Sequence, residues 1–250
     1  MQRRAFLIAA AAFVIGVAGY LLWGRQRRDT EAPARVVAAG SSPATGTAVI
    51  EGEVHFTGAA PVPGKLHREA DPYCARQEMT DPTVLVADGR LANVWVHVIE
   101  GAPDAPPPPT PVDIDQRDCM YSPRVTTAVV GQKIVARNGD PILHNVHTYL
   151  GTSTWFNRGM PNEKAAPIES TAVEPGMIKW RCDVHPWMRG YVGVSRNSFQ
   201  AVSGKDGLFR IASLPAGRYV LEAWHEKLGG KTLEVTAPGR VVFEYSGAEQ

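Results

Sequence analysis

Seven consecutive residues of this chain hold three side chains that bind soft metal ions. The segment Cys182-Asp-Val-His185-Pro-Trp-Met188 offers a thiol, an imidazole and a thioether, and His144 lies 38 residues before Cys182. A loop between two adjacent strands can present the first three, while His144 reaches the same point from a neighbouring strand. One thiolate, two imidazoles and a weak thioether suit copper cycling between its two oxidation states.

The expected geometry is a near-trigonal plane of Cys182, His144 and His185, with Met188 as a distant axial ligand. Zinc also accepts cysteine and histidine ligands, but the methionine favours copper. Each residue has an alternative without a metal. Cys182 could be a buried inert thiol, the two histidines could be hydrogen-bonded in the core or on the surface, and Met188 could fill the core. His147 should point to the opposite face of its strand from His144 and be structural or exposed.

This pattern resembles the cupredoxins, or blue copper proteins, in their amicyanin- and plastocyanin-like form, over roughly residues 90 to 195. The resemblance implies a Greek-key β-sandwich or barrel that holds one copper ion, Cu(I) or Cu(II). The implied ligands are His144, Cys182, His185 and Met188.

The same resemblance assigns roles to three neighbours of the ligands. Asn145 is expected to tie its strand to the ligand loop, close to the sulfur. An apolar patch with Pro186 and Trp187, around an exposed His185, is expected to dock a redox partner protein. The alternative is that Trp187 simply packs the loop.

Cys74 and Cys119 are the other two cysteines. With Cys182 given to the metal they form an even pair, and in an exported protein such a pair predicts a disulfide. A second metal site is the weaker alternative. The sequence has no Cys-x-x-Cys-His motif, which excludes covalently attached haem.

The N-terminus carries a targeting or anchoring signal. Arg3 and Arg4 precede an apolar stretch, 5–23, that ends before further arginines. A twin-arginine export signal and an uncleaved membrane anchor are both open interpretations of residues 1–28. Either one locates the body of the protein outside the cytoplasm, in the periplasm if the cell is bacterial, with or without attachment to the inner membrane. The composition of residues 29–47 predicts a flexible linker.

Composition predicts an all-β globular protein. Hydrophobic residues make up 44% and charged residues 20%, and 24 glycines and 20 prolines separate short runs of β-branched and aromatic residues. A net charge of +1 gives no sign of a nucleic-acid partner. We expect a cupredoxin-like copper domain over 48–196 and a small β domain over 197–250.

The C-terminal segment resembles carboxypeptidase regulatory-like domains through Leu214-Pro-Ala-Gly217 and Tyr219-Val-Leu221. That resemblance implies a β-sandwich without catalysis of its own. Because the segment is short for an independent domain, it either borrows strands from residues 48–100 or packs on the first domain.

Three functions remain in competition. An electron carrier needs one copper site, whereas a copper oxidase or nitrite reductase needs further histidine-rich centres. The remaining histidines are scattered and form no paired motif, so we expect no enzyme: they are His55, His67, His97, His147 and His225. A copper-binding or delivery protein, or a cell-surface binding module, is the alternative.

Overall fold

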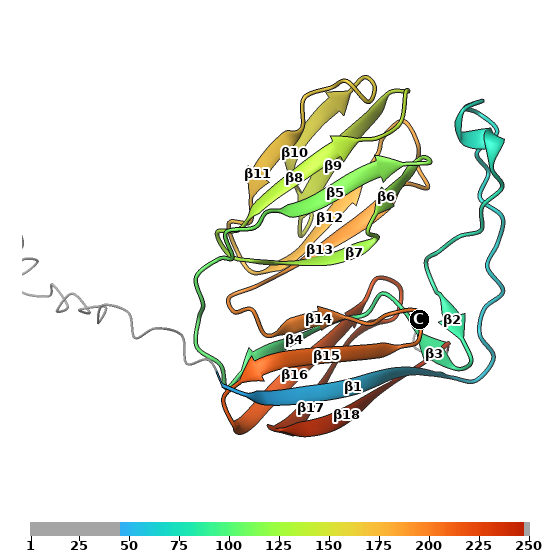
Figure 1. Ribbon diagram of the computed structural model, residues 1–250. Helices are drawn as coiled ribbons and strands as arrows, with labels where there is room; N and C mark the ends of the chain where they lie inside the picture. The colour runs from blue at the N-terminus through green and yellow to red at the C-terminus, as the bar shows by residue number, and fades with distance from the viewer. Residues whose placement is uncertain (1–45, 248–250) are drawn as a thin grey trace, which may run out of the picture. The chain divides into compact units, whose positions relative to one another are not determined.

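The computed structural model describes residues 46–247, which form an all-β structure (Figure 1). The strands make two sandwiches, each with its own hydrophobic core. In this part of the chain the only helix is the 3-10 turn η1 (Cys74–Arg76), and nothing helical in it could span a membrane. The all-β prediction is confirmed. The predicted N-terminal helix and nearly all of the linker lie outside the described residues.

The central sandwich contains the candidate ligands and consists of two sheets. One sheet has the order β11 (Ile168–Thr171), β8 (Lys133–Asn138), β5 (Val112–Arg117) and β6 (Met120–Ser122). The other has the order β10 (Ser153–Met160), β9 (His144–Leu150), β12 (Gly176–Arg181), β13 (Arg189–Ser195) and β7 (Val125–Val129).

Alternation of buried and exposed side chains, clear in β5 and β12, explains how this sandwich forms. In β12, Ile178 and Trp180 are buried while Lys179 and Arg181 are exposed. Side chains two residues apart share a face, so one face of the sheet meets the core and the other meets water.

The terminal sandwich combines strands from both ends of the described chain. Its first sheet runs β15 (Leu208–Leu214), β1 (Ala48–Thr57), β3 (Arg90–Leu91) and β2 (Val86–Ala87), with β18 (Gly239–Ser246) pairing β1 in parallel. Its second sheet runs β14 (Gln200–Val202), β4 (Trp95–Glu100), β16 (Gly217–His225) and β17 (Gly229–Ala237).

The predicted boundary at residues 196–197 differs from the boundary between the two cores. Strands β1 and β4, assigned from sequence to the copper domain, pair with C-terminal strands instead. The physical reason is that the C-terminal strands alone are too few to enclose a hydrophobic core. Strands β1 and β4 each complete one of the two sheets of the terminal sandwich. This outcome corresponds to the expectation that the short segment borrows strands from 48–100. The likeness to carboxypeptidase regulatory-like domains stays a prediction.

Buried contacts connect the two sandwiches. Arg124, just before β7, pairs with Glu226 after β16 at 2.5 Å, and the Tyr191 hydroxyl donates to the same carboxylate at 2.8 Å. The Trp95 indole lies so close to Gly193 that a Cβ there would come within 2.3 Å of the ring. Glycine at position 193 therefore permits this close approach.

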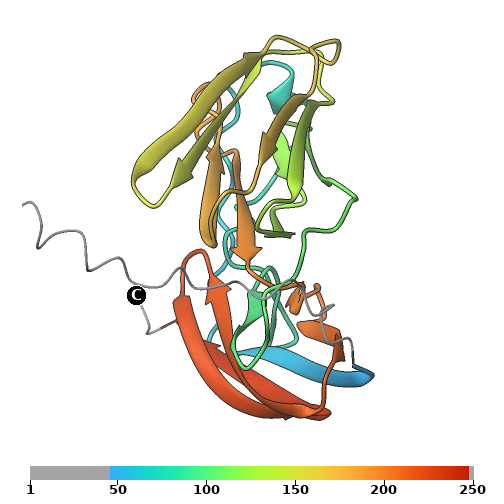
Figure 2. The same cartoon turned by 90° about the vertical axis from the view of Figure 1, so that its left-hand side faces the viewer.

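A long irregular segment, residues 58–85, connects β1 with β2; we call it the cover segment (Figures 1 and 2). It leaves the terminal sandwich, contacts the central sandwich and returns. A disulfide between Cys74 and Cys119 fastens it there. Through Asp71 it contacts His185, one of the candidate ligands.

Candidate metal centre

The predicted ligand loop closes the hairpin between β12 and β13. Arg181 and Arg189 form the last paired position, so the loop between them lies beyond the ladder. The amide of Met188 donates to the carbonyl of His185 at 2.9 Å, and the amide of Cys182 donates to the carbonyl of Met188 at 3.3 Å. These two hydrogen bonds fold the loop back on itself and fix the spacing of its candidate ligands.

Strand β9 brings the upstream histidine to this loop. It pairs with β12 in the same sheet, and His144 is its first residue. The Nδ1 atoms of His144 and His185 are 3.0 Å apart, and Nδ1 of His185 is 3.8 Å from Sγ of Cys182. Ligand atoms of all three residues lie within 4.8 Å of one another, and all three side chains are buried.

Met188 lies at the end of the loop and is completely buried in the core of the central sandwich. Its backbone is fixed by the two loop hydrogen bonds described above. Its role as the fourth ligand stays a prediction.

A buried carboxylate fixes the orientation of His144. Nε2 of His144 donates to Asp140 Oδ2 at 2.9 Å, which leaves Nδ1 facing the cluster. The backbone amides of Asp118 and Cys119 also donate to Asp140, at 2.8 Å each. Burial alone would raise the pKa of Asp140, but these hydrogen bonds lower it to about 2. A carboxylate behind a ligand imidazole fixes its tautomer and raises its basicity.

The thiol is ready to ionise. Burial would raise the pKa of Cys182, but hydrogen bonding to His144 and His185, and to the amide of Asn145, lowers it to about 6. In the same way burial opposes the charged form of His144, and the hydrogen bond to Asp140 raises its pKa overall. A thiolate is the form that binds a metal, and metal binding displaces the imidazole proton. The donor set therefore fits a soft or borderline ion such as copper.

Asn145 connects β9 with the ligand loop. Its side-chain oxygen accepts from the amide of Asp183 at 2.6 Å, and its side-chain nitrogen donates to the Asp183 carboxylate at 3.0 Å. Its own amide points at Sγ of Cys182, 3.5 Å away. His147 lies outside the cluster, where its Nδ1 contacts Asp183 at 2.9 Å.

The prediction that His185 has an exposed edge is wrong, because this residue is only 2% exposed. The cover segment is the physical reason, because Asp71 Oδ2 lies 3.4 Å from His185 Nε2. Trp187 is half-buried against the core, and its indole donates to the carbonyl of Cys119 at 3.0 Å. Pro186 remains exposed. A docking role for Pro186 and Trp187 stays a prediction, without the exposed histidine that motivated it.

The predicted disulfide is confirmed. Cys74 and Cys119 are bonded with a Cα–Cα distance of 5.7 Å, and Cys182 is the free cysteine among the described residues. The bond lies beside the candidate ligands, since Cys74 groups with Asp71 and His185.

Sequence reasoning missed three residues around the centre: Asp71, Tyr73 and Asp140. Asp140 gave a weak signal, because it precedes His144 by four residues. Asp71 and Tyr73 lie more than 65 residues before His144 and gave no signal except their closeness to Cys74.

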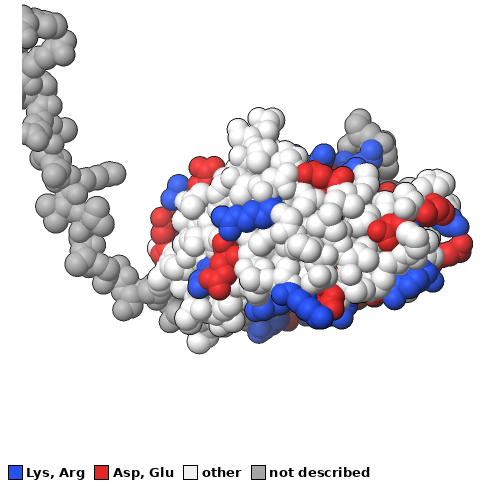
Figure 3. Space-filling view, turned by 90° about the horizontal axis from the view of Figure 1, so that it is seen from above, with Lys and Arg blue, Asp and Glu red and all other residues white. Residues whose placement is uncertain are grey.

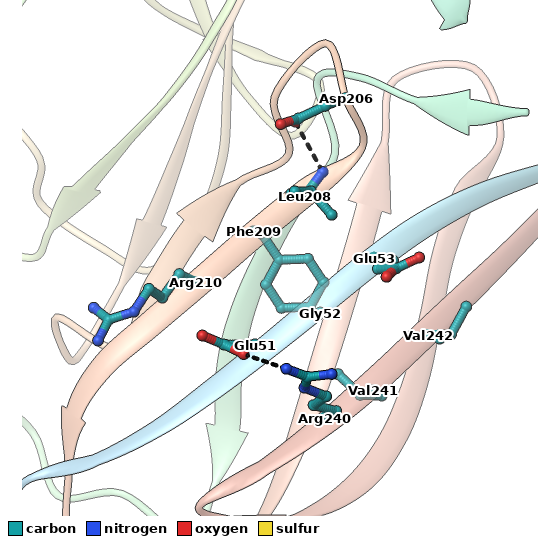
Figure 4. Close-up of a pocket in the computed structure, with 10 residues that line it drawn as sticks. All are labelled: Glu51, Gly52, Glu53, Asp206, Leu208, Phe209, Arg210, Arg240, Val241 and Val242. Atoms are coloured by element: carbon teal, nitrogen blue, oxygen red, sulfur yellow. Dashed lines mark hydrogen bonds and ion pairs between the residues drawn. The ribbon is translucent and has the colours of Figure 1, made fainter. Parts of the chain in front are cut away.

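A separate hollow of about 510 Å³ lies on the terminal sandwich (Figure 4). Residues of β1, β15 and β18 line it, and an ion pair of 3.3 Å joins two of them, Glu51 and Arg240. None of the candidate ligands lines this hollow, so we do not connect it with the metal chemistry.

Comparisons with known proteins give structural matches alone. No family model matches the sequence, and no curated protein does. Among solved structures, a purple cupredoxin from Nitrosopumilus maritimus is 26% identical, covering 34% of this chain and 99% of its own, with a TM-score of 0.30. Amicyanin from Paracoccus versutus is 23% identical, covering 40% and 97%, with a TM-score of 0.31.

A copper-containing nitrite reductase from Thermus scotoductus is 15% identical and covers 57% of this chain and 28% of its own, with a TM-score of 0.32. Every one of these TM-scores is below 0.5, so these likenesses carry no functional argument for this chain.

Proposed function

We propose that this chain binds one copper ion through His144, Cys182, His185 and Met188 and carries single electrons outside the cytoplasm. The observation that carries the proposal is the buried convergence of one low-pKa thiol and two imidazole nitrogens. Such a donor set, with a thioether close by in sequence, is typical of type 1 copper sites.

The protein's part in this function is to hold the donor atoms still. Copper, when bound, supplies a one-electron couple. Asp140 orients His144, and the amide of Asn145 points at the Cys182 sulfur. The two loop hydrogen bonds keep His185 and Met188 at a fixed spacing. Because these supports do not depend on the charge of the ion, the ligands need little rearrangement when an electron arrives or leaves.

A carrier is favoured over an enzyme by the grouping of ligands. Within residues 46–247, each group of histidine, cysteine and acidic side chains that could hold a metal includes His144 or His185. An oxidase or nitrite reductase would need an independent second centre. We therefore propose no catalytic activity.

The disulfide supports a location outside the cytoplasm, because such bonds persist in oxidising compartments. The N-terminal signal predicts the same location. A redox protein is the proposed partner, and nucleic acid is not. Lys and Arg side chains are interspersed with Asp and Glu on the face seen in Figure 3, which gives no basic stripe there for a phosphate backbone.

Copper delivery is the second candidate, and burial argues against it. A delivery protein hands its ion to a partner, so the partner must reach the ligands. Here His144 is 0% and His185 2% exposed, and a disulfide-fastened segment covers them.

Copper titration of the metal-free chain tests the proposal. The wild-type chain should bind one equivalent, and the bound ion should accept and release one electron reversibly. His144→Gln should abolish this stoichiometric binding. His147→Gln is the matched control, since His147 belongs to the same strand but contacts Asp183 outside the cluster. Equal losses in the two variants would refute the assigned ligand set.

A further inference from the structure

The cover segment reaches the outer side of both candidate ligand imidazoles through one tight turn, Asp71-Pro-Tyr-Cys74. Asp71 Oδ1 accepts from the amides of Tyr73 at 2.8 Å and Cys74 at 3.2 Å. This arrangement is an Asx turn, in which a side chain replaces a backbone acceptor. Because Oδ1 is held in this way, Oδ2 is aimed at His185 Nε2, 3.4 Å away.

The same turn also reaches the other imidazole through one intermediate. The Tyr73 hydroxyl donates to Asp140 Oδ1 at 3.0 Å, and Oδ2 of that carboxylate accepts from His144 Nε2 at 2.9 Å. Each imidazole therefore has a carboxylate on the nitrogen that faces away from the cluster. One carboxylate comes from the central sandwich itself, and the other comes from the cover segment.

The turn is held firmly in this position. Cys74 is bonded to Cys119, and the Arg68 guanidinium donates to the carbonyl of Asp118 at 2.5 Å. The Arg76 guanidinium lies over the Tyr73 ring at 3.4 Å from its centroid. The disulfide and the Arg68 hydrogen bond anchor the segment to the central sandwich, and the Arg76 contact stiffens the turn itself, so the position of Asp71 is specified.

We propose that Asp71 is a positioning residue that holds the His185 imidazole through Nε2, excludes water from that edge, and favours the more highly charged state of the bound ion. A carboxylate on the distal nitrogen makes an imidazole a stronger donor. Its negative charge stabilises Cu(II) more than Cu(I), because the attraction scales with the charge of the ion. Asp71 thereby lowers the reduction potential. This inference rests on the proposed copper function.

The test is Asp71→Asn in the full chain. Asparagine retains the oxygen that accepts from Tyr73 and Cys74, so the turn survives, while an NH₂ group replaces the oxygen facing His185. We expect the ratio of Cu(II) to Cu(I) affinity to fall about tenfold, which raises the potential of a one-electron couple by about 59 mV. Glu69→Gln is the control, because that exposed carboxylate lies two residues before the turn and pairs with Lys65 and His67, not with a ligand imidazole or an anchor of the turn.

A second measurement uses the metal-free protein. The Nε2 proton of His185 should exchange slowly with water in the wild-type chain and quickly in Asp71→Asn, as followed by NMR. An unchanged potential in Asp71→Asn, an equal shift in Glu69→Gln, or unchanged proton exchange would overturn the role of Asp71. A wild-type chain that binds no copper would instead refute the proposed function, and the exchange measurement would still report the contact with Asp71.

Discussion

Removing the disulfide between Cys74 and Cys119 should destabilise the protein strongly. The two cysteines are 45 residues apart, and both are buried. In the chain-entropy relation, a crosslink that closes a loop of this length stabilises the folded state by about 4 kcal/mol. The double variant Cys74→Ala/Cys119→Ala should therefore lose about that much free energy of unfolding.

The assay is urea denaturation of the metal-free chain, followed by tryptophan fluorescence. Working without metal separates the crosslink from any stabilisation by a bound ion. Cys182→Ala serves as the control, since it removes a buried sulfur without removing a crosslink. A loss below about 1 kcal/mol in the double variant would refute the entropic reasoning, because the crosslink would then not restrict the unfolded chain as the relation requires.

Two further predictions concern buried groups. Asp140→Asn weakens the hydrogen bond that orients His144 and should lower copper affinity about 10- to 100-fold in chelator competition. The control, Asp113→Asn, alters an exposed carboxylate and should leave the affinity unchanged. Equal affinities in the two variants would contradict the orienting role of Asp140. Burial, together with the nearby Arg124 guanidinium, lowers the pKa of His225 from 6.5 to about 4. The unfolded chain therefore takes up this proton first, and stability should fall as the pH drops from 6.5 towards 4, by about 3 kcal/mol at the lower end. His225→Asn should remove that part of the slope in denaturant titrations, and an unchanged slope would contradict the assignment.

The ligand loop could be predicted because its chemistry is local. Cys182, His185 and Met188 lie within seven residues, and a hairpin loop is the natural way to present them together. The prediction of His144 depends on its spacing from the loop and on the cupredoxin resemblance. The pairing of β9 with β12, the strand that precedes the loop, brings His144 to that loop. The disulfide could be predicted because two cysteines remain once Cys182 is assigned to the metal, and they can pair with each other.

The division into sandwiches could not be predicted in the same way. Alternation in Ala48–Thr57 identifies a half-buried strand, but it does not identify the strand's partners. Its main partners are β15 and β18, more than 150 residues away in sequence, whereas the nearby β3 pairs with it only at His55. Pairing at that separation depends on which exposed edge remains to be covered, and a local pattern carries no information about it.

The covered edge of His185 was missed for a related reason. The cupredoxin resemblance concerns the central sandwich, where an exposed ligand histidine was expected. The covering residue, Asp71, comes from the connection between β1 and β2, which belong to the terminal sandwich. Its sequence surroundings, rich in charged and turn-forming residues, are typical of a surface loop.

The proposed function depends above all on Cys182, which would donate a thiolate to a single copper ion. The most direct test is the visible absorption and electron paramagnetic resonance of the full chain loaded with one equivalent of Cu(II). We predict an intense thiolate-to-copper band with the narrow copper hyperfine splitting of a type 1 site, and we predict that Cys182→Ser loses both. A colourless Cu(II) complex of the wild-type chain, or a coloured Cys182→Ser variant, would contradict the account.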